Sequence, residues 1–155
     1  MQFTREYFHR IDRSGRLFHD DSRLTDSGFL EFFFKRLRIN DTGLNEMYPY
    51  VSPCGREMNF VQAENLAFVF HELRSGNLYY NFTGLCLPFR PGQLRSGIAG
   101  TLVHPARPPC WGALSPTLLL QLTKSIDESG GLYSLLWEGE RFPIQPWPED
   151  KPPPL

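Results

Sequence analysis

Hydrophobic and polar positions at the start of the chain predict a β-hairpin. Residues 7–11 and 16–19 are short segments rich in aromatic and aliphatic side chains, and residues 12–15 between them are typical of a tight turn. In this register His9 lies opposite His19. We therefore expect the chain to begin with two antiparallel strands.

The apolar residues that follow recur at helical spacing. Asp26 or Ser27 is a suitable N-cap, because a side-chain oxygen there accepts a hydrogen bond from the first turn. One broad apolar face comes next, formed by Phe29, Leu30, Phe33, Phe34 and Leu37. Basic residues, which suit the C-terminal end of the helix dipole, are expected in the last turns: Lys35, Arg36 and Arg38.

The middle of the chain reads as short strands separated by turns. Segments 48–51, 58–61, 66–71 and 78–82 are rich in strand-forming residues and predict an antiparallel meander. The third of these is apolar on both faces, which favours a central strand. A further strand at residues 85–89 is expected at a sheet edge, because Pro88 has no N–H to donate.

The last third of the chain predicts one more helix and one more hairpin. Residues 104–112 are rich in proline and are expected to be irregular, and Ser115 and Pro116 then start a helix. A hairpin follows over residues 132–144. We predict a single compact α+β domain over residues 1–145, built of hairpins and a meander with two main helices packed on the sheet. Residues 146–155 form a proline-rich tail, expected to be extended or bound by a partner.

Composition narrows the functional classes. At 155 residues the chain is long enough for one core, and its formal net charge of −1 gives no overall field that would attract nucleic acid or anionic lipid. No apolar run approaches the roughly 20 residues that a membrane helix needs. The three cysteines form no C-x-x-C pair, and the chain carries no phosphate-binding or dinucleotide-binding motif, so no cofactor is expected.

Few residues suggest catalysis or metal binding. His9, His19 and Asp21 share one face of the expected hairpin and form a weak candidate metal site, although half-exposed strand histidines are the commoner reading. Cys54 lies two residues before Arg56, which favours a thiolate, but a nucleophile also needs a base. The histidines outside the hairpin cannot be placed near Cys54 from sequence, so we predict no catalytic residues.

Two alternative sites lie around the segment 48–60. Its turn offers backbone N–H groups and a guanidinium to a small anion or phosphate ligand, through Ser52, Cys54, Gly55, Arg56 and Glu57. The second alternative is RNA, with Lys35, Arg36, Arg38 and Arg56 as a basic ridge and Tyr48 and Tyr50 for base stacking.

Four segments resemble an uncharacterised eukaryotic group, protein family 0598. They are Thr4-Arg-Glu-Tyr-Phe8, Gly15-Arg-Leu-Phe18 with Asp20-Asp-Ser22, Phe33-Phe-Lys-Arg-Leu-Arg38, and the Ser-Pro-Cys-Gly-Arg-Glu core of Tyr48 to Phe60. The resemblance extends to about Leu73. It implies a mitochondrial protein without an established activity, whose shared residues suit a scaffold. The chain shows no Arg/Ser-rich leader, so the mitochondrial compartment rests on the resemblance alone.

These observations favour a non-catalytic binding or scaffold module. The expected role is that of an accessory protein in a mitochondrial assembly, such as a respiratory complex or the ribosome, with protein partners. The residues expected to contact the partner are Tyr48, Tyr50, Arg36, Arg38 and Trp147. An anion-binding domain or an enzyme that uses the Ser52 to Glu57 turn is the alternative, and an RNA-binding accessory protein is the third reading.

Overall fold

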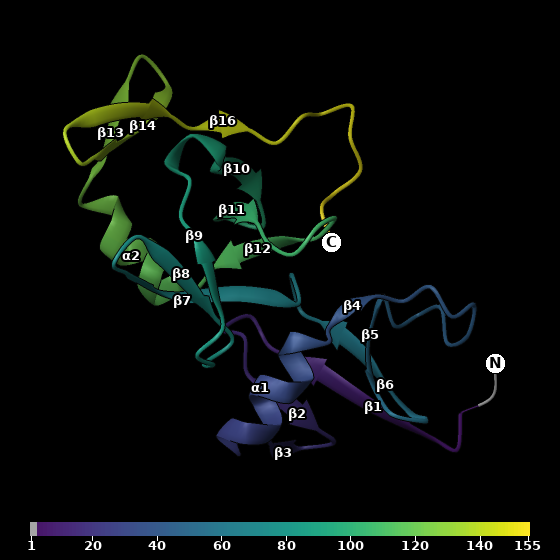
Figure 1. Cartoon of the computed structure of the whole chain (residues 1–155). Helices are drawn as coiled ribbons and strands as arrows, with labels where there is room; N and C mark the ends of the chain where they lie inside the picture. The colour runs from purple at the N-terminus through teal and green to yellow at the C-terminus, as the bar shows by residue number, and fades with distance from the viewer. Residues whose placement is uncertain (1–2) are drawn as a thin grey trace.

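In the computed structural model, which describes residues 3–155, the chain forms an α+β fold with three sheets (Figure 1). The first sheet has the order β3-β2-β1-β6-β5-β4 and consists of β1 (Arg5–Ile11), β2 (Leu17–His19), β3 (Ser22–Arg23), β4 (Arg38–Ile39), β5 (Tyr50–Cys54) and β6 (Glu57–Ala63). The second has the order β16-β10-β11-β12-β7-β8-β9 and consists of β7 (Phe68–Arg74), β8 (Asn77–Tyr80), β9 (Cys86–Pro88), β10 (Arg95–Ile98), β11 (Thr101–Pro105), β12 (Trp111–Leu114) and β16 (Gln145–Pro146). The third is the meander β13 (Ile126–Ser129), β14 (Leu132–Trp137) and β15 (Glu140–Pro143).

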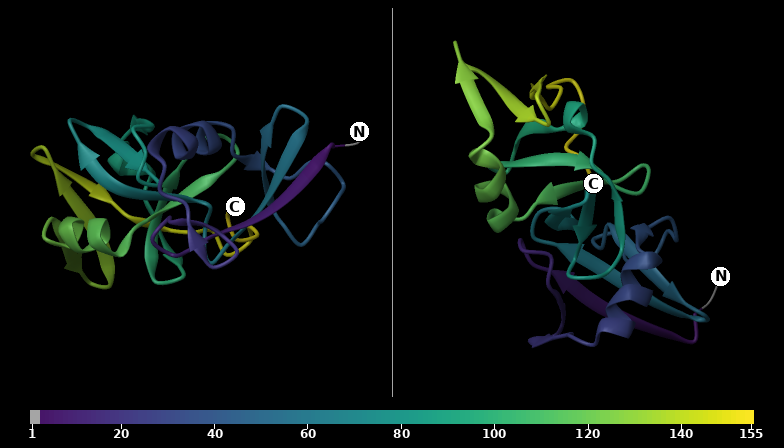
Figure 2. Two further views of the ribbon diagram at one scale, coloured as in Figure 1. Left: turned by 90° about the horizontal axis from the view of Figure 1, so that it is seen from below. Right: turned by 60° about the vertical axis from the view of Figure 1, so that its left-hand side comes forward.

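The remaining elements are helical. They are α1 (Ser27–Lys35), α2 (Pro116–Thr123) and the short 3₁₀ helix η1 (Pro91–Gln93). Figure 2 shows the first sheet with α1 beside the second sheet with α2. One continuous cluster of buried residues joins the two regions, and it contains Phe33 of α1, Phe70 of β7 and Leu118 of α2. The two large sheets therefore share a core.

The first hairpin is confirmed in its register. β1 and β2 are antiparallel, with His9 opposite His19 and Ile11 opposite Leu17. After β2, Asp20 and Asp21 form a turn into a further short strand, β3.

The first helix is confirmed at its start and is shorter than expected at its end. Asp26 is the N-cap, and its Oδ2 accepts a hydrogen bond of 2.8 Å from the Phe29 N–H. The helix ends at Lys35, with Arg36 as C-cap. Arg38 was expected in the last turn, but it lies on β4, because the chain turns back into the sheet after Leu37.

The expected meander is divided between two sheets. Hairpin β5–β6 belongs to the first sheet and β7–β8–β9 to the second. Each group joins its sheet through a parallel pair, β1 with β6 and β7 with β12. Two expectations are confirmed: β7 lies inside its sheet, and β9 lies at an edge.

Strands β10, β11 and β12 were not expected, because glycine and proline interrupt their sequence. At Gly112 the missing side chain is what allows β12 to lie beside β7. A Cβ on Gly112 would lie 2.4 Å from Cε2 of Phe70. The glycine thus permits a strand at a place where sequence propensity argues against one.

The C-terminal tail packs against the second sheet of the same chain. β16 pairs in parallel with β10, and the rings of Trp147 and Trp111 are perpendicular with centroids 4.9 Å apart. The Trp111 N–H donates a hydrogen bond of 2.7 Å to the Leu155 carbonyl. The proline-rich tail therefore gains order from the sheet that it covers.

Arg107 connects the second sheet to the end of α1. Its guanidinium donates hydrogen bonds to the carbonyls of Leu37 at 2.8 Å and Phe34 at 3.2 Å, and to Tyr80 Oη at 3.3 Å. The last carbonyls of a helix have no partner within it, so a cation here stabilises the helix end. This contact fixes α1 relative to the rest of the domain.

Candidate ligand-binding groove

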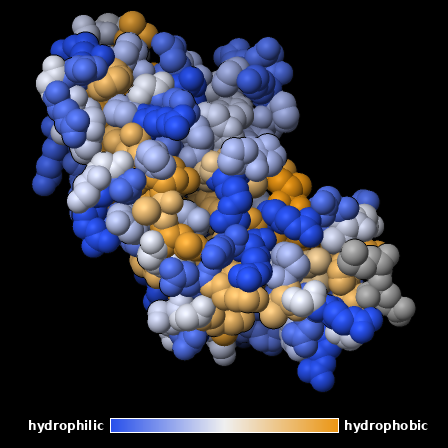
Figure 3. All heavy atoms as spheres, viewed as in Figure 1, coloured by the Kyte–Doolittle hydropathy of each residue, from blue (hydrophilic) through white to orange (hydrophobic). Residues whose placement is uncertain are grey.

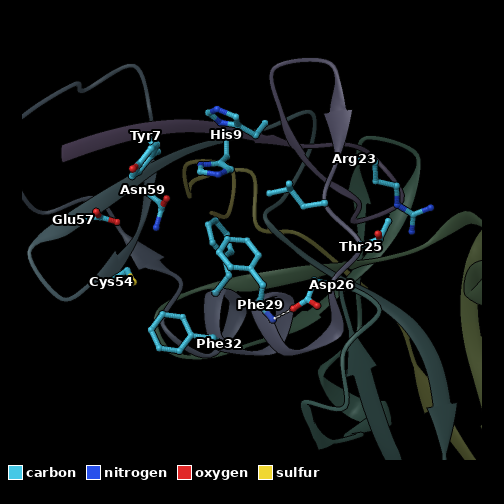
Figure 4. Close-up of a pocket in the computed structure, with 13 residues that line it drawn as sticks. Tyr7, His9, Arg23, Thr25, Asp26, Phe29, Phe32, Cys54, Glu57 and Asn59 are labelled. Carbon is cyan, nitrogen blue, oxygen red and sulfur yellow. Dashed lines mark hydrogen bonds between the residues drawn. The ribbon is translucent and has the colours of Figure 1, made fainter.

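A groove of about 600 Å³ lies between α1 and the first sheet (Figure 4). It is lined by aromatic side chains with a few polar ones between them: Tyr7, His9, His19, Arg23, Leu24, Thr25, Asp26, Phe29, Phe32, Phe33, Cys54, Glu57 and Asn59. A volume of 300–1,000 Å³ is usual for small-molecule sites, so this groove is large enough for a ligand of two or three fused rings.

The alternation of side chains along β1 builds the sheet side of the groove. Tyr7 and His9 face α1, whereas Phe8 between them faces the other side of the sheet, where it stacks on Phe60 with ring centroids 5.7 Å apart. The parallel pairing of β1 with β6 places Asn59 beside Tyr7. Residues about fifty positions apart in the chain thus form one wall.

The helix side of the groove carries exposed aromatic residues. Phe29 and Phe32 each keep 38% of their surface exposed, and the Arg36 guanidinium lies 3.6 Å from the Phe32 ring centroid. Apolar surface interrupted by charged side chains is visible over the region of α1 in Figure 3. Aromatic rings left open to solvent along a groove are typical of a binding site.

His9 is a buried polar residue of the groove, as Asn59 is. It is 7% exposed, and its Nδ1 has no hydrogen-bond partner among the described residues. Its ring packs between His19, at 5.0 Å between centroids, and Phe33, at 5.3 Å. Burial, with a smaller contribution from His19, lowers the pKa of His9 to about 4. The imidazole is therefore neutral at pH 7.

This lowered pKa predicts a loss of stability in mild acid. In the unfolded chain His9 binds a proton near pH 6.5, whereas in the folded chain it binds one only near pH 4. Between these pH values protonation favours the unfolded state, so the free energy of unfolding falls as the pH falls. We expect this group alone to remove about 2 kcal/mol of unfolding free energy between pH 7 and pH 5. Urea unfolding at the two pH values measures the loss.

The control for that measurement is His9→Phe, which keeps a ring in the same place without a titrating group. The pKa values of His71 and His104 are also lowered by burial, so part of the pH dependence should remain in the variant. An unchanged difference between pH 7 and pH 5 would show that His9 does not resist protonation in the folded state.

The candidate metal set is not assembled. Within residues 3–155, no group of three or more His, Cys, Asp or Glu side chains is placed to hold a metal ion. His9 and His19 do lie together, but the carboxylate near His19 Nε2 is that of Asp20, at 3.7 Å. Asp21 lies in the turn after β2 and does not complete the set that the sequence suggested.

Cys54 lines the groove at a distance from the histidine. In the sheet register Cys54 lies opposite Glu57, and Glu57 lies opposite Arg5, four residues before His9 on β1. At about 3.3 Å per residue this offset is about 13 Å along the strands, with two strand spacings across them. Cys54 and His9 therefore share a groove without forming a nucleophile and base pair.

The proposed anion-binding turn is a short hairpin. Only Gly55 and Arg56 form the turn, with φ of +60° at Gly55, while Cys54 and Glu57 belong to the strands. Ser52 is 1% exposed, and its hydroxyl donates a 2.7 Å hydrogen bond to the Phe33 carbonyl of α1. Ser52 thus holds the helix on the sheet and does not face a ligand at the turn.

The expected partner contacts occupy very different environments. Tyr50 is 1% exposed, and burial raises its pKa to about 12, so its prediction as a contact or stacking residue is wrong. Trp147 is half-buried against Trp111. Arg36 and Arg38 are exposed, the latter paired with Asp41. Tyr48 is half-buried beside Phe8 on the outer face of the first sheet, at 5.1 Å between ring centroids.

Sequence reasoning missed most of the groove. The sequence placed Phe29 and Phe33 on the apolar face of the first helix and gave Phe32 no role. It placed Tyr7 and Asn59 in strands and did not connect them with a site. The signal available was the run of three phenylalanines at positions 32–34, which places aromatic rings on both sides of a helix.

Among residues 3–155, no helix is both long enough and apolar enough to cross a membrane.

Comparison with known proteins gives a family and a fold. The family described as "Domain of unknown function (DUF4505)" matches residues 1–141. Two crystal structures are similar in fold. One is a DUF1285 family protein from Silicibacter pomeroyi DSS-3, with a TM-score of 0.64 at 14% sequence identity, covering 93% of this chain and 82% of that protein. The other is a DUF1285 family protein from Shewanella baltica OS155, with a TM-score of 0.58 at 16% identity, covering 76% of this chain and 91% of that protein. Since this match extends over residues 1–141 of the 155, the chain belongs to the DUF4505 family.

Proposed function

We propose that this protein is a non-catalytic binding module whose ligand occupies the groove between α1 and the first sheet. The observation that carries the proposal is a groove of about 600 Å³ with open aromatic rings around one buried histidine nitrogen that lacks a partner among residues 3–155. A buried polar atom without a hydrogen bond costs on the order of 1–3 kcal/mol, and a ligand that supplies the bond recovers part of that cost.

The separation of the reactive side chains supports binding over catalysis. Nucleophilic catalysis needs a base within hydrogen-bonding distance of the thiol, whereas Cys54 and His9 are offset by about 13 Å along the strands. Asn59, which lies between them, donates its Nδ2–H to the Ser52 carbonyl at 2.9 Å. The Asn59 side chain therefore serves the pairing of β5 with β6 and is not placed to link the thiol to the imidazole.

Binding of an uncharged aromatic probe tests the proposal. We expect 1-aminoanthracene to bind in a saturable 1:1 manner, with a Kd on the order of 10–100 µM for a ligand of this size. Phe32→Ala should weaken binding by about fivefold to tenfold, because it removes one aromatic contact. Fluorescence titration provides the measurement.

Phe8→Ala is the matched control for that experiment. Phe8 is 39% exposed, close to the 38% of Phe32, but it lies on the opposite face of the sheet. The control should bind the probe within twofold of the wild type. Equal weakening in both variants, or no saturable binding to the wild type, would contradict a site in the groove.

The role in a mitochondrial assembly remains a prediction, and a second surface supports it. Phe8 and Tyr48 lie on the outer face of the first sheet, and Met47, next to Tyr48 in the chain, is 75% exposed. On native gels of mitochondrial extract, Phe8→Glu should release the protein from a high-mass fraction, while Phe32→Ala should leave it there. Wild-type protein that migrates only as a monomer would count against this role.

A further inference from the structure

We infer that the ligand of the groove is an uncharged aromatic molecule that carries a hydroxyl group, as phenols do. This inference rests on the proposed binding function and adds the chemical class of the ligand. It follows from three properties of the lining: aromatic rings on opposite walls, a neutral imidazole between them, and an excess of carboxylates at the edge.

The aromatic rings select a flat apolar body. Tyr7 on β1 and Phe29 and Phe32 on α1 face the groove from opposite sides. Aromatic side chains gain most from ligands that stack on them or meet them edge to face. A ring system of two or three rings fits the volume and contacts both walls.

The imidazole of His9 selects the polar group of the ligand. A neutral imidazole has one nitrogen that donates and one that accepts, and rotation of the ring about the Cβ–Cγ bond exchanges the position of Nδ1 with that of Cδ2. Nδ1 is buried and has no partner within the described residues, so the imidazole has a hydrogen bond left to make when rotation turns this nitrogen toward the groove. A hydroxyl both donates and accepts, which lets it pair with the imidazole in either tautomer.

The charged side chains at the edge disfavour an anion. The lining contains the carboxylates of Asp26 and Glu57 against the single guanidinium of Arg23. Figure 4 shows His9 over the middle of the groove, with Glu57 toward one end and Arg23 and Asp26 toward the other. A ligand carboxylate beside His9 would lie between Asp26 and Glu57, and the guanidinium of Arg23 would offset only part of the repulsion.

Competition against bound 1-aminoanthracene by three two-ring compounds tests the ligand class. The compounds are naphthalene, 2-naphthol and 2-naphthoate, which differ in one substituent. For the wild type we expect 2-naphthol to bind about fivefold to tenfold more tightly than naphthalene, as one hydrogen bond provides. We expect 2-naphthoate to bind most weakly. In His9→Phe, naphthalene and 2-naphthol should bind equally well.

The outcomes separate this inference from the proposed function. If naphthalene and 2-naphthol compete equally with the probe in the wild type, the groove binds aromatic ligands but the hydroxyl class is wrong. A preference for 2-naphthol that persists in His9→Phe also overturns the role of the imidazole. If 2-naphthoate binds most tightly, the site is an anion site. If the probe itself does not bind, the proposed function fails first.

Discussion

Asn81→Leu is expected to lower the free energy of unfolding by about 4 kcal/mol, because it leaves three buried backbone groups without partners. Asn81 is 1% exposed. Its Nδ2 donates to the carbonyls of Gly15 at 3.1 Å and Ala67 at 2.9 Å, and its Oδ1 accepts from the Val69 N–H at 3.1 Å. These bonds tie the turn of the first hairpin, which carries His9 and His19 on its strands, to the second sheet.

The backbone of Asn81 adds a second cost, which a control separates. Its φ is +54°, a left-handed conformation that asparagine tolerates better than leucine. Asn45 has φ of +48°, and its side chain makes no hydrogen bond within the described residues, so Asn45→Leu carries the backbone cost alone. Urea unfolding of both variants gives the difference. If Asn81→Leu costs no more than Asn45→Leu, the three hydrogen bonds do not stabilise the fold.

Gly112→Ala is expected to cost about 3 kcal/mol for a purely steric reason. The new methyl group would lie 2.4 Å from Cε2 and 2.9 Å from Cζ of Phe70, and 3.1 Å from the Phe68 carbonyl oxygen. Phe70 is fully buried in the shared core, so its ring has no free space into which to move. The parallel pair of β12 with β7 would have to separate.

Two further variants check this explanation. Gly28→Ala within α1 places its methyl 3.5 Å from Asp26 Oδ2, an ordinary contact, and should be neutral or stabilising because alanine favours helix. Phe70→Leu combined with Gly112→Ala should cost less than the sum of the two single changes, since the smaller side chain makes room. Additive costs in thermal or urea unfolding would show that the Phe70 ring is not the obstacle.

The local elements were predictable where a turn or a cap sets the register. The turn at residues 12–15 placed His9 opposite His19, and Asp26 and Ser115 marked the starts of α1 and α2. Such features depend on residues only a few positions apart, so their energies can be judged from the sequence. The strand at Gly112 could not be predicted in this way, because the glycine is required by Phe70 of another strand.

The groove was not predictable for a related reason. Its sheet wall exists because β1 pairs in parallel with β6, which places Tyr7 beside Asn59. Its helix wall depends on Ser52, whose hydroxyl donates to the Phe33 carbonyl, and on Arg107, which donates to the carbonyls of Phe34 near the end of α1 and of Leu37 just after it. Each contact joins segments that are distant in the chain, and no short pattern encodes it.

By itself, the sequence of this protein determined an α+β composition of short strands and two capped helices, since periodicity and turn residues act over short distances. Only the tertiary structure decided which strands share a sheet, where the proline-rich tail lies, and that aromatic residues of α1 face a buried histidine of β1 across a groove. These outcomes depend on burying one common core, whose free energy belongs to the whole chain and not to any segment.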